Sequence, residues 1–132
     1  ATKRKQIYID LPELNIIHVN SENETNFLEA KNNIAALMSK NAGILRSAEK
    51  LNEALEEPRI IKSRLPEKIN EYNLLKIKHI ADICTLICES ALIRTESRGG
   101  HIREDYRSED PKLCVHLIQQ KDQHFRFQEI NK

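Results

Sequence analysis

The chain has 132 residues, the size of one ordinary domain with room for a usable hydrophobic core. Charged residues make up 31% of it, but the formal net charge is only +1, which excludes strong electrostatic attraction to nucleic acid or to an anionic membrane. The mean hydropathy is −0.58 and no apolar run is long enough to span a bilayer, so we expect no membrane insertion. Three cysteines, an odd count, and the lack of a basic-then-apolar leader favour a reducing compartment, so we expect a cytoplasmic protein.

The first segment favours an extended conformation. Residues 6–11 are rich in β-branched and aromatic side chains and end at Pro12, which predicts a strand. The residues that follow are polar, aperiodic and rich in Asn, Ser and Glu, as is typical of a linker. We therefore interpret residues 1–25 as an extended segment and linker.

Two amphipathic helices are expected next. Apolar residues at helical spacing begin at Phe27, and Gly43 interrupts the pattern. Ser47 can cap a second helix, because its hydroxyl can accept a hydrogen bond from a backbone amide two or three residues further on. Pro58 lacks an amide hydrogen, so we expect a break or kink just before it and a short helical continuation after it.

The third helix is predicted over residues 67–95, with Pro66 in its first turn. Its apolar residues leave little polar circumference, and a helix of that kind is normally surrounded by other helices. Each Leu or Ile buried in this way contributes about 1.5–3 kcal/mol. We therefore predict that residues 26–98 form an antiparallel three-helix bundle with this helix at its centre.

The pattern changes near the C-terminus. Residues 113–118 are strand-like, residues 124–130 alternate between apolar and polar, and Lys121 and Asp122 lie between them as a turn. A lone hairpin is marginal in water, so it needs the bundle or the strand at residues 6–11 to pack on. The fold class is therefore mainly α: a three-helix bundle with a small C-terminal β-hairpin. Residues 99–132 supply a charged loop and this hairpin.

The loop at residues 94–106 (RTESRGGHIREDY) crowds side chains of both signs into one short stretch. Gly99 and Gly100 are expected to supply the positive φ that ends a helix and reverses the chain. A simple connection between two elements does not need so many hydrogen-bonding groups. The loop therefore indicates a junction with another polar surface.

This loop resembles a motif in the C-terminal helical domain of the succinate dehydrogenase, fumarate reductase and L-aspartate oxidase flavoproteins. In that family Arg-x-Glu-Ser-Arg-Gly-x-His precedes Arg-x-Asp-aromatic-Pro. The matching residues here are Arg94, Glu96, Ser97, Arg98, Gly99, His101, Arg103, Asp105 and Tyr106, with Arg107 in place of the proline. Residues 38–46 (MSKNAGILR) are similar to a second family segment, Met-x-x-x-x-Gly-Ile-x-Arg. The resemblance covers residues 26–111.

The resemblance implies that the chain is a C-terminal piece of an FAD-dependent oxidoreductase whose partners are the flavin-binding and capping domains of the same polypeptide. No GxGxxG occurs, and the paired glycines follow a helix instead of preceding one, so the sequence offers no dinucleotide cradle. We expect no FAD, no metal and no catalytic residue in this piece, and no activity from the isolated chain. The predicted domain-interface residues are Arg46, Arg94, Glu96, Arg98, Gly99, His101, Arg103 and Asp105.

Within the family, resemblance to L-aspartate oxidase is preferred. The reasons are the segment at residues 42–46 and the lack of the tryptophan that usually follows the charged loop in respiratory subunits. This resemblance implies oxidation of L-aspartate to iminoaspartate for NAD biosynthesis, with oxygen or fumarate as electron acceptor. A succinate dehydrogenase or fumarate reductase flavoprotein subunit is the alternative. A second alternative is an independent helical module that binds another protein through residues 94–107. The sequence leaves the oligomeric state open.

Two groups of residues admit a chemical interpretation. Cys84 and Cys88 lie four apart on one helical face, which suits either a metal site or small core residues, and we favour the core. His101 with Glu96 or Asp105 could perform acid–base chemistry. However, neither a nucleophile nor a cofactor cradle accompanies this histidine, so we favour a role in fixing the loop by hydrogen bonds.

Overall fold

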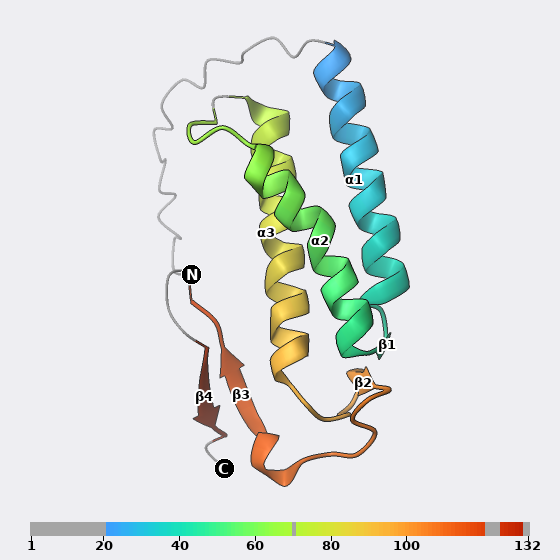
Figure 1. Cartoon of the computed structure of the whole chain (residues 1–132). Helices are drawn as coiled ribbons and strands as arrows, with labels where there is room; N and C mark the ends of the chain where they lie inside the picture. Colours follow the sequence, from blue (N-terminus) through green and yellow to red (C-terminus); the bar gives the residue numbers. More distant parts are fainter. Residues whose placement is uncertain (1–20, 70, 121–124, 131–132) are drawn as a thin grey trace, which may run out of the picture.

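The computed structural model describes residues 21–69, 71–120 and 125–130. Three helices, α1 (Ser21–Asn41), α2 (Ala48–Arg64) and α3 (Tyr72–Ile93), form an up-down-up bundle in which each helix contacts the other two (Figure 1). The predicted mainly α class with a C-terminal β-hairpin is confirmed. The strand expected at residues 6–11 lies outside the described residues.

The first helix begins earlier than its apolar pattern predicts. Helix α1 begins at Ser21, so it includes residues 21–25, which the sequence assigned to a linker. The prediction relied on an apolar stripe, and this first turn has none. The helix ends at Asn41, and the connection to α2 contains Gly43.

Helix α2 begins as predicted and passes through Pro58 without interruption. Ser47 is the N-cap, and its Oγ accepts a hydrogen bond from the Lys50 amide at 3.2 Å. The helix runs to Arg64, so a break near Pro58 is wrong, whereas the helical continuation expected after Pro58 is confirmed. Pro58 is buried in the bundle, and this packing outweighs the loss of one backbone hydrogen bond.

The boundary between α2 and α3 also differs from the prediction. Helix α3 begins at Tyr72, later than residue 67, and Pro66 lies in the connection before it. Leu65 is extended, with φ −75° and ψ 142°. A residue that precedes proline is disfavoured in the helical conformation, so Pro66 ends α2 instead of starting α3.

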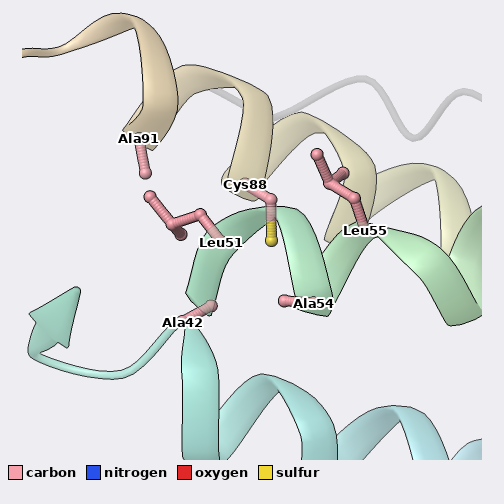
Figure 2. Packing of buried hydrophobic residues seen from close by; sticks show 6 residues of the cluster. All are labelled: Ala42, Leu51, Ala54, Leu55, Cys88 and Ala91. Carbon is pink, nitrogen blue, oxygen red and sulfur yellow. The ribbon is translucent and has the colours of Figure 1, made fainter. Parts of the chain in front are cut away.

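The core is small and lies along the line where the helices meet. One cluster contains Ala42, Leu51, Ala54, Leu55, Cys88 and Ala91 (Figure 2), and a second contains Ile34, Ile77 and Cys84. Burial raises the pKa of the Cys84 thiol and raises that of Cys88 to about 11, because the thiolate is disfavoured away from water. Both side chains therefore act as small apolar core residues.

Two strand pairs complete the fold. β3 (Val115–Ile118) follows a short 3₁₀ turn (Pro111–Leu113) and pairs antiparallel with β4 (Arg126–Glu129), as predicted. The expected turn at residues 121–122 lies outside the described residues. A second, unpredicted pair joins β1 (Leu45–Arg46) in parallel to β2 (Ile102–Arg103). This pair attaches the α1–α2 connection to the charged loop.

Candidate functional site

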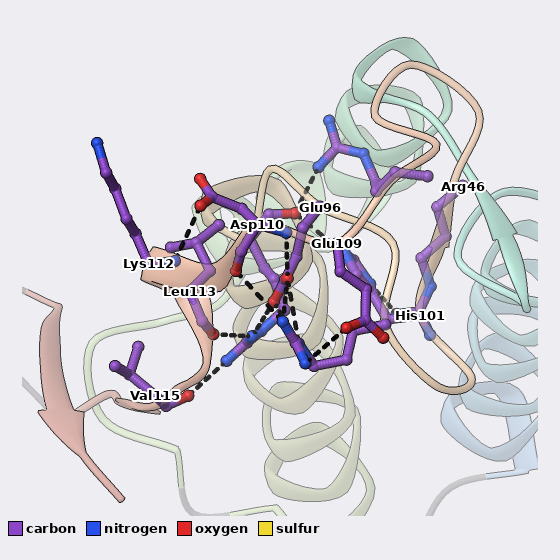
Figure 3. A network of polar contacts seen from close by, with 11 residues as sticks. Arg46, Glu96, His101, Glu109, Asp110, Lys112, Leu113 and Val115 are labelled. Carbon is purple, nitrogen blue, oxygen red and sulfur yellow. Dashed lines mark hydrogen bonds and ion pairs between the residues drawn. The ribbon is translucent and has the colours of Figure 1, made fainter.

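Glu96 is the centre of the charged loop. Its side chain is 0% exposed, and both carboxylate oxygens accept hydrogen bonds from Arg98 Nε at 3.1 Å. One oxygen also accepts from Arg94 Nη1, and the other from the Asp110 amide at 3.0 Å (Figure 3). Burial opposes ionisation, but the hydrogen bonds from Arg98, the Asp110 backbone and Arg94 outweigh it and hold the Glu96 pKa to about 2. The side chain is therefore a fully enclosed carboxylate.

The two arginines that bind this carboxylate extend its reach across the loop. Arg94 donates to the carbonyl of Leu113 at 2.8 Å and to that of Val115 at 2.9 Å. Arg98 forms an ion pair with Glu109 at 3.0 Å. The end of α3 is thereby fastened to the 3₁₀ turn and to the first residue of β3.

Arg103 and Asp105 join two helix ends. The Arg103 side chain is 1% exposed, and its Nη1 donates to the carbonyls of Ala91 at 2.7 Å and Leu92 at 3.3 Å in the last turn of α3. Its Nε and Nη2 bind the two oxygens of Asp105, each at 2.7 Å, and Asp105 accepts from the Ala48 amide at 2.9 Å. The bidentate Arg103 contact holds the pKa of Asp105 well below its usual range. The positive charge of Arg103 thus lies at the negative, C-terminal end of the α3 dipole, and the negative charge of Asp105 lies at the positive, N-terminal end of the α2 dipole.

The helix end and the chain reversal are separate features. Helix α3 ends at Ile93, where Arg103 takes up its carbonyls, so the prediction that Gly99 and Gly100 end this helix is wrong. Gly99 has φ +57°, a left-handed conformation that suits glycine, and it is the only glycine of positive φ in the described ranges. It makes a tight turn in which Arg98 and His101 exchange backbone hydrogen bonds of 2.8 and 3.0 Å.

His101 is held in one neutral tautomer. Its Nε2 lies 3.0 Å from the carbonyl of Arg94, and its Nδ1 lies 2.8 Å from Nη1 of Arg46. A carbonyl can only accept and a guanidinium can only donate, so Nε2 carries the hydrogen and Nδ1 is bare. Burial lowers the His101 pKa, and the charges of Arg46 and Arg103 lower it further, although the bond to the Arg94 carbonyl acts the other way. The His101 ring therefore fixes the loop through its two hydrogen bonds. The carboxylates of Glu96 and Asp105 bind arginines and not His101.

This tautomer gives the fold a testable pH dependence. Unfolded His101 binds a proton near pH 6.5, whereas the folded ring does so only at lower pH, so its contribution to stability is present above pH 6.5 and is lost as pH falls below it. We expect the free energy of unfolding in urea to decrease between about pH 7 and about pH 5.5. We expect His101→Gln to remove part of this decrease, because glutamine does not titrate. An unchanged pH slope in His101→Gln would contradict this assignment.

Arg46 differs from the other arginines of the site. Its Nε donates to the carbonyls of Ala42 at 3.2 Å and Gly43 at 2.6 Å, which caps the end of α1, and one Nη1 hydrogen goes to His101. Within the described part of the chain it contacts no carboxylate. The eight predicted residues are thus brought together at one end of the bundle, but their use at a domain interface stays a prediction.

The outward side of α3 was missed as a functional surface. Large apolar side chains at helical spacing lie on it, each between 39% and 65% exposed: Tyr72, Leu75, Ile83, Leu86 and Ile87. The apolar circumference was correctly noticed in the sequence, but it was interpreted as the centre of a bundle. Helices α1 and α2 cover one side of α3 only, because two helices cannot enclose a third.

Comparison with known proteins identifies the family. The family model described as the fumarate reductase flavoprotein C-terminus matches residues 31–131. The chain belongs to this family. The resemblance noted in the sequence is thereby confirmed, and the charged loop and its supporting arginines are features of a flavoprotein C-terminal domain.

Several full-length flavoproteins are similar to the chain. The succinate dehydrogenase flavoprotein subunit of Coxiella burnetii is 27% identical over 105 residues, which cover 71% of this chain and 18% of that protein. The fumarate reductase flavoprotein subunit of Helicobacter pylori is 30% identical over 105 residues, which cover 70% and 14%. An L-aspartate oxidase of a Nostoc species is 47% identical over 45 residues, which cover 34% and 8%. The chain therefore spans less than a fifth of the length of these relatives.

The structure of this flavoprotein C-terminal domain also bears on two other kinds of site. In the ranges that it describes, no helix is both long and apolar enough to cross a bilayer. Nor do three or more His, Cys, Asp or Glu side chains gather as metal ligands in those same ranges.

Proposed function

We propose that this chain is the C-terminal helical domain of an L-aspartate oxidase. The parent enzyme would bind FAD in its upstream portion and oxidise L-aspartate to iminoaspartate for NAD biosynthesis in the cytoplasm. The support is the local identity of 47% to an L-aspartate oxidase, together with the segment at residues 42–46. The succinate dehydrogenase or fumarate reductase flavoprotein subunit is the second candidate, because those relatives align over 105 residues.

The role of the domain is to pack against the flavin-binding and capping domains and to stabilise them. The observation that carries this role is the outward apolar side of α3, from Tyr72 to Ile87. Exposed large apolar side chains that gather on one side of a helix are normally covered, and each contributes about 1.5–3 kcal/mol when it is fully buried. Glu96 and Arg103 hold the loop beside this side of α3 in one conformation, so the surface offered to the partner is rigid.

Enzyme assays on the complete reading frame test this proposal. We expect the full-length protein to contain bound FAD and to oxidise L-aspartate but not succinate, and the isolated chain to bind no FAD, because it has no glycine-rich phosphate cradle. Flavin absorbance and product formation with each substrate are the measurements.

Each other outcome has a clear meaning. Oxidation of succinate without L-aspartate activity would select the second candidate. Flavin absorbance in the purified isolated chain would overturn the purely structural role. A reading frame without an upstream flavin-binding region would favour an independent helical interaction module with residues 94–107 as its epitope.

A further inference from the structure

A groove runs between α3 and β3 on the outward side of the bundle. Its volume is about 510 Å³. Leu86, Ile87 and Leu117 supply apolar walls, whereas Arg46, Arg94 and His101 line it where α3 ends. An apolar groove that has cationic groups at one end suits a ligand of mixed character.

Only one of these groups is a cation without a counter-charge. Arg94 binds the Glu96 carboxylate, and His101 is neutral because of its two hydrogen bonds. Arg98 and Arg103, the remaining arginines of the loop, bind Glu96 and Asp105. Among the described residues, Arg46 alone of these four arginines has no carboxylate partner.

The guanidinium of Arg46, one of the residues that line the groove, has hydrogen-bond donors to spare. Its Nε hydrogen and one Nη1 hydrogen are used, and no bond to Nη2 is formed within the described part of the chain. The side chain is half-buried, so its charge is partly desolvated. A desolvated charge is costly unless it is paired, and a carboxylate matches the guanidinium with two parallel hydrogen bonds.

We infer that the Arg46 end of this groove receives a carboxylate side chain carried by an apolar segment of the flavin-binding or capping portion of the same polypeptide. This inference rests on the proposed function. Leu86 and Ile87 belong both to the groove and to the outward apolar side of α3, so one partner covers the two surfaces together. The carboxylate fixes the register of that contact, because an apolar stripe alone permits sliding.

The chemistry of the groove favours a tethered carboxylate over a free anion. An inorganic anion would lose its hydration at Arg46 and would gain nothing from the apolar walls. A Glu or Asp on an apolar segment buries its neighbours against Leu86 and Leu117 while its oxygens reach the guanidinium. The partner is therefore both apolar and acidic.

Reaction of arginines with phenylglyoxal, measured by peptide mass spectrometry, tests this inference on the unmodified sequence. We expect Arg46 to react readily in the isolated chain and about tenfold or more slowly in the full-length flavoprotein, a factor worth about 1.4 kcal/mol. Arg59, which is exposed on α2, is the control and should react alike in both proteins. Equal reactivity of Arg46 in the two proteins would overturn the inference and leave the flavin-dependent function standing. Slow reaction already in the isolated chain would place the carboxylate within residues 1–132 and also overturn it.

Two variants distinguish an ion pair at Arg46 from simple burial of Arg46 by the partner. Arg46→Lys and Arg46→Gln both lose the Nε bonds to Ala42 and Gly43, but only the lysine keeps the charge. In the isolated chain we expect the two variants to unfold at similar temperatures. In the full-length protein Arg46→Gln should release FAD at a lower temperature than Arg46→Lys. Identical release temperatures in the full-length protein would show that the charge has no partner there.

Discussion

Replacing Arg103 with methionine is expected to lower the free energy of unfolding by about 3 kcal/mol. This is the lower end of the range for removing one member of a buried ion pair, because Arg103 is 1% exposed but Asp105 is 31% exposed. Methionine keeps the apolar stem of the side chain and removes the guanidinium. Asp105 then remains without its bidentate partner, and the carbonyls of Ala91 and Leu92 lose their donor. Since a domain of this size is stable by only about 5–15 kcal/mol, the loss is a large part of the total.

Urea denaturation followed by circular dichroism measures this effect. Arg107→Met is the matched control: Arg107 is exposed, and its Nε donates only to the Glu104 carbonyl, at 3.3 Å. We expect the control to change stability by about 0.5 kcal/mol or less. Arg103→Lys should fall between the two, because an ammonium cannot form the bidentate contact with Asp105. Equal stabilities of the Arg103 and Arg107 variants would contradict the capping role.

Helical periodicity predicted the three helices well, because the apolar residues that repeat at helical spacing are mostly those that pack in the core. Ser47 was recognised as an N-cap from its residue type, and the structure confirms the bond. One error lies where a tertiary contact overrides a local rule: Pro58 stays inside α2, where its side chain is buried. Local propensity alone does not contain such a contact. The start of α1 at Ser21 was missed because the prediction used only apolar periodicity, which its first turn lacks.

The site was predicted as a set of residues but not as a set of pairs. The resemblance selected Glu96, Arg98 and Arg103, and all are part of the network. Each of the two carboxylates Glu96 and Asp105 has an arginine two residues away on either side. Nothing in the sequence indicates that Glu96 binds both of its arginines whereas Asp105 binds Arg103. Most charged side chains of the loop form ion pairs with one another within the chain. What remains available is Arg46 and the apolar side of α3.

The residues of the family motif therefore stabilise the fold of the domain itself. Asp105 caps the start of α2, Arg103 caps the end of α3, and Glu96 fastens the hairpin to the bundle through Arg94. A bundle with so small a core gains much of its specificity from these contacts. Because they lie at one end of the bundle, beside the outward apolar side of α3, they set the form of the surface that the domain presents.

Replacing Glu96 with glutamine is expected to cost about 3–5 kcal/mol, because Arg94 then loses its counter-charge and Arg98 keeps only its ion pair with the exposed Glu109. The amide nitrogen also cannot accept from the Asp110 amide if it occupies that side. Glu109→Gln is the matched control: Glu109 pairs with the same Arg98 at 3.0 Å, but its side chain is 60% exposed, so we expect a change below about 1 kcal/mol. Urea unfolding at neutral pH gives both values.

The same variant tests the ionisation of Glu96. Its pKa falls from 4.5 to about 2 in the fold, so the stability that it contributes is fully present above pH 4.5 and is lost as pH falls from 4.5 towards 2. We expect the wild-type chain to lose stability steeply across this interval and Glu96→Gln to lose it less steeply, because glutamine does not titrate. Asp105 titrates in both proteins, so some slope remains in the variant. Parallel acid-unfolding curves for the two proteins would mean that Glu96 is not the buried carboxylate on which the loop is built.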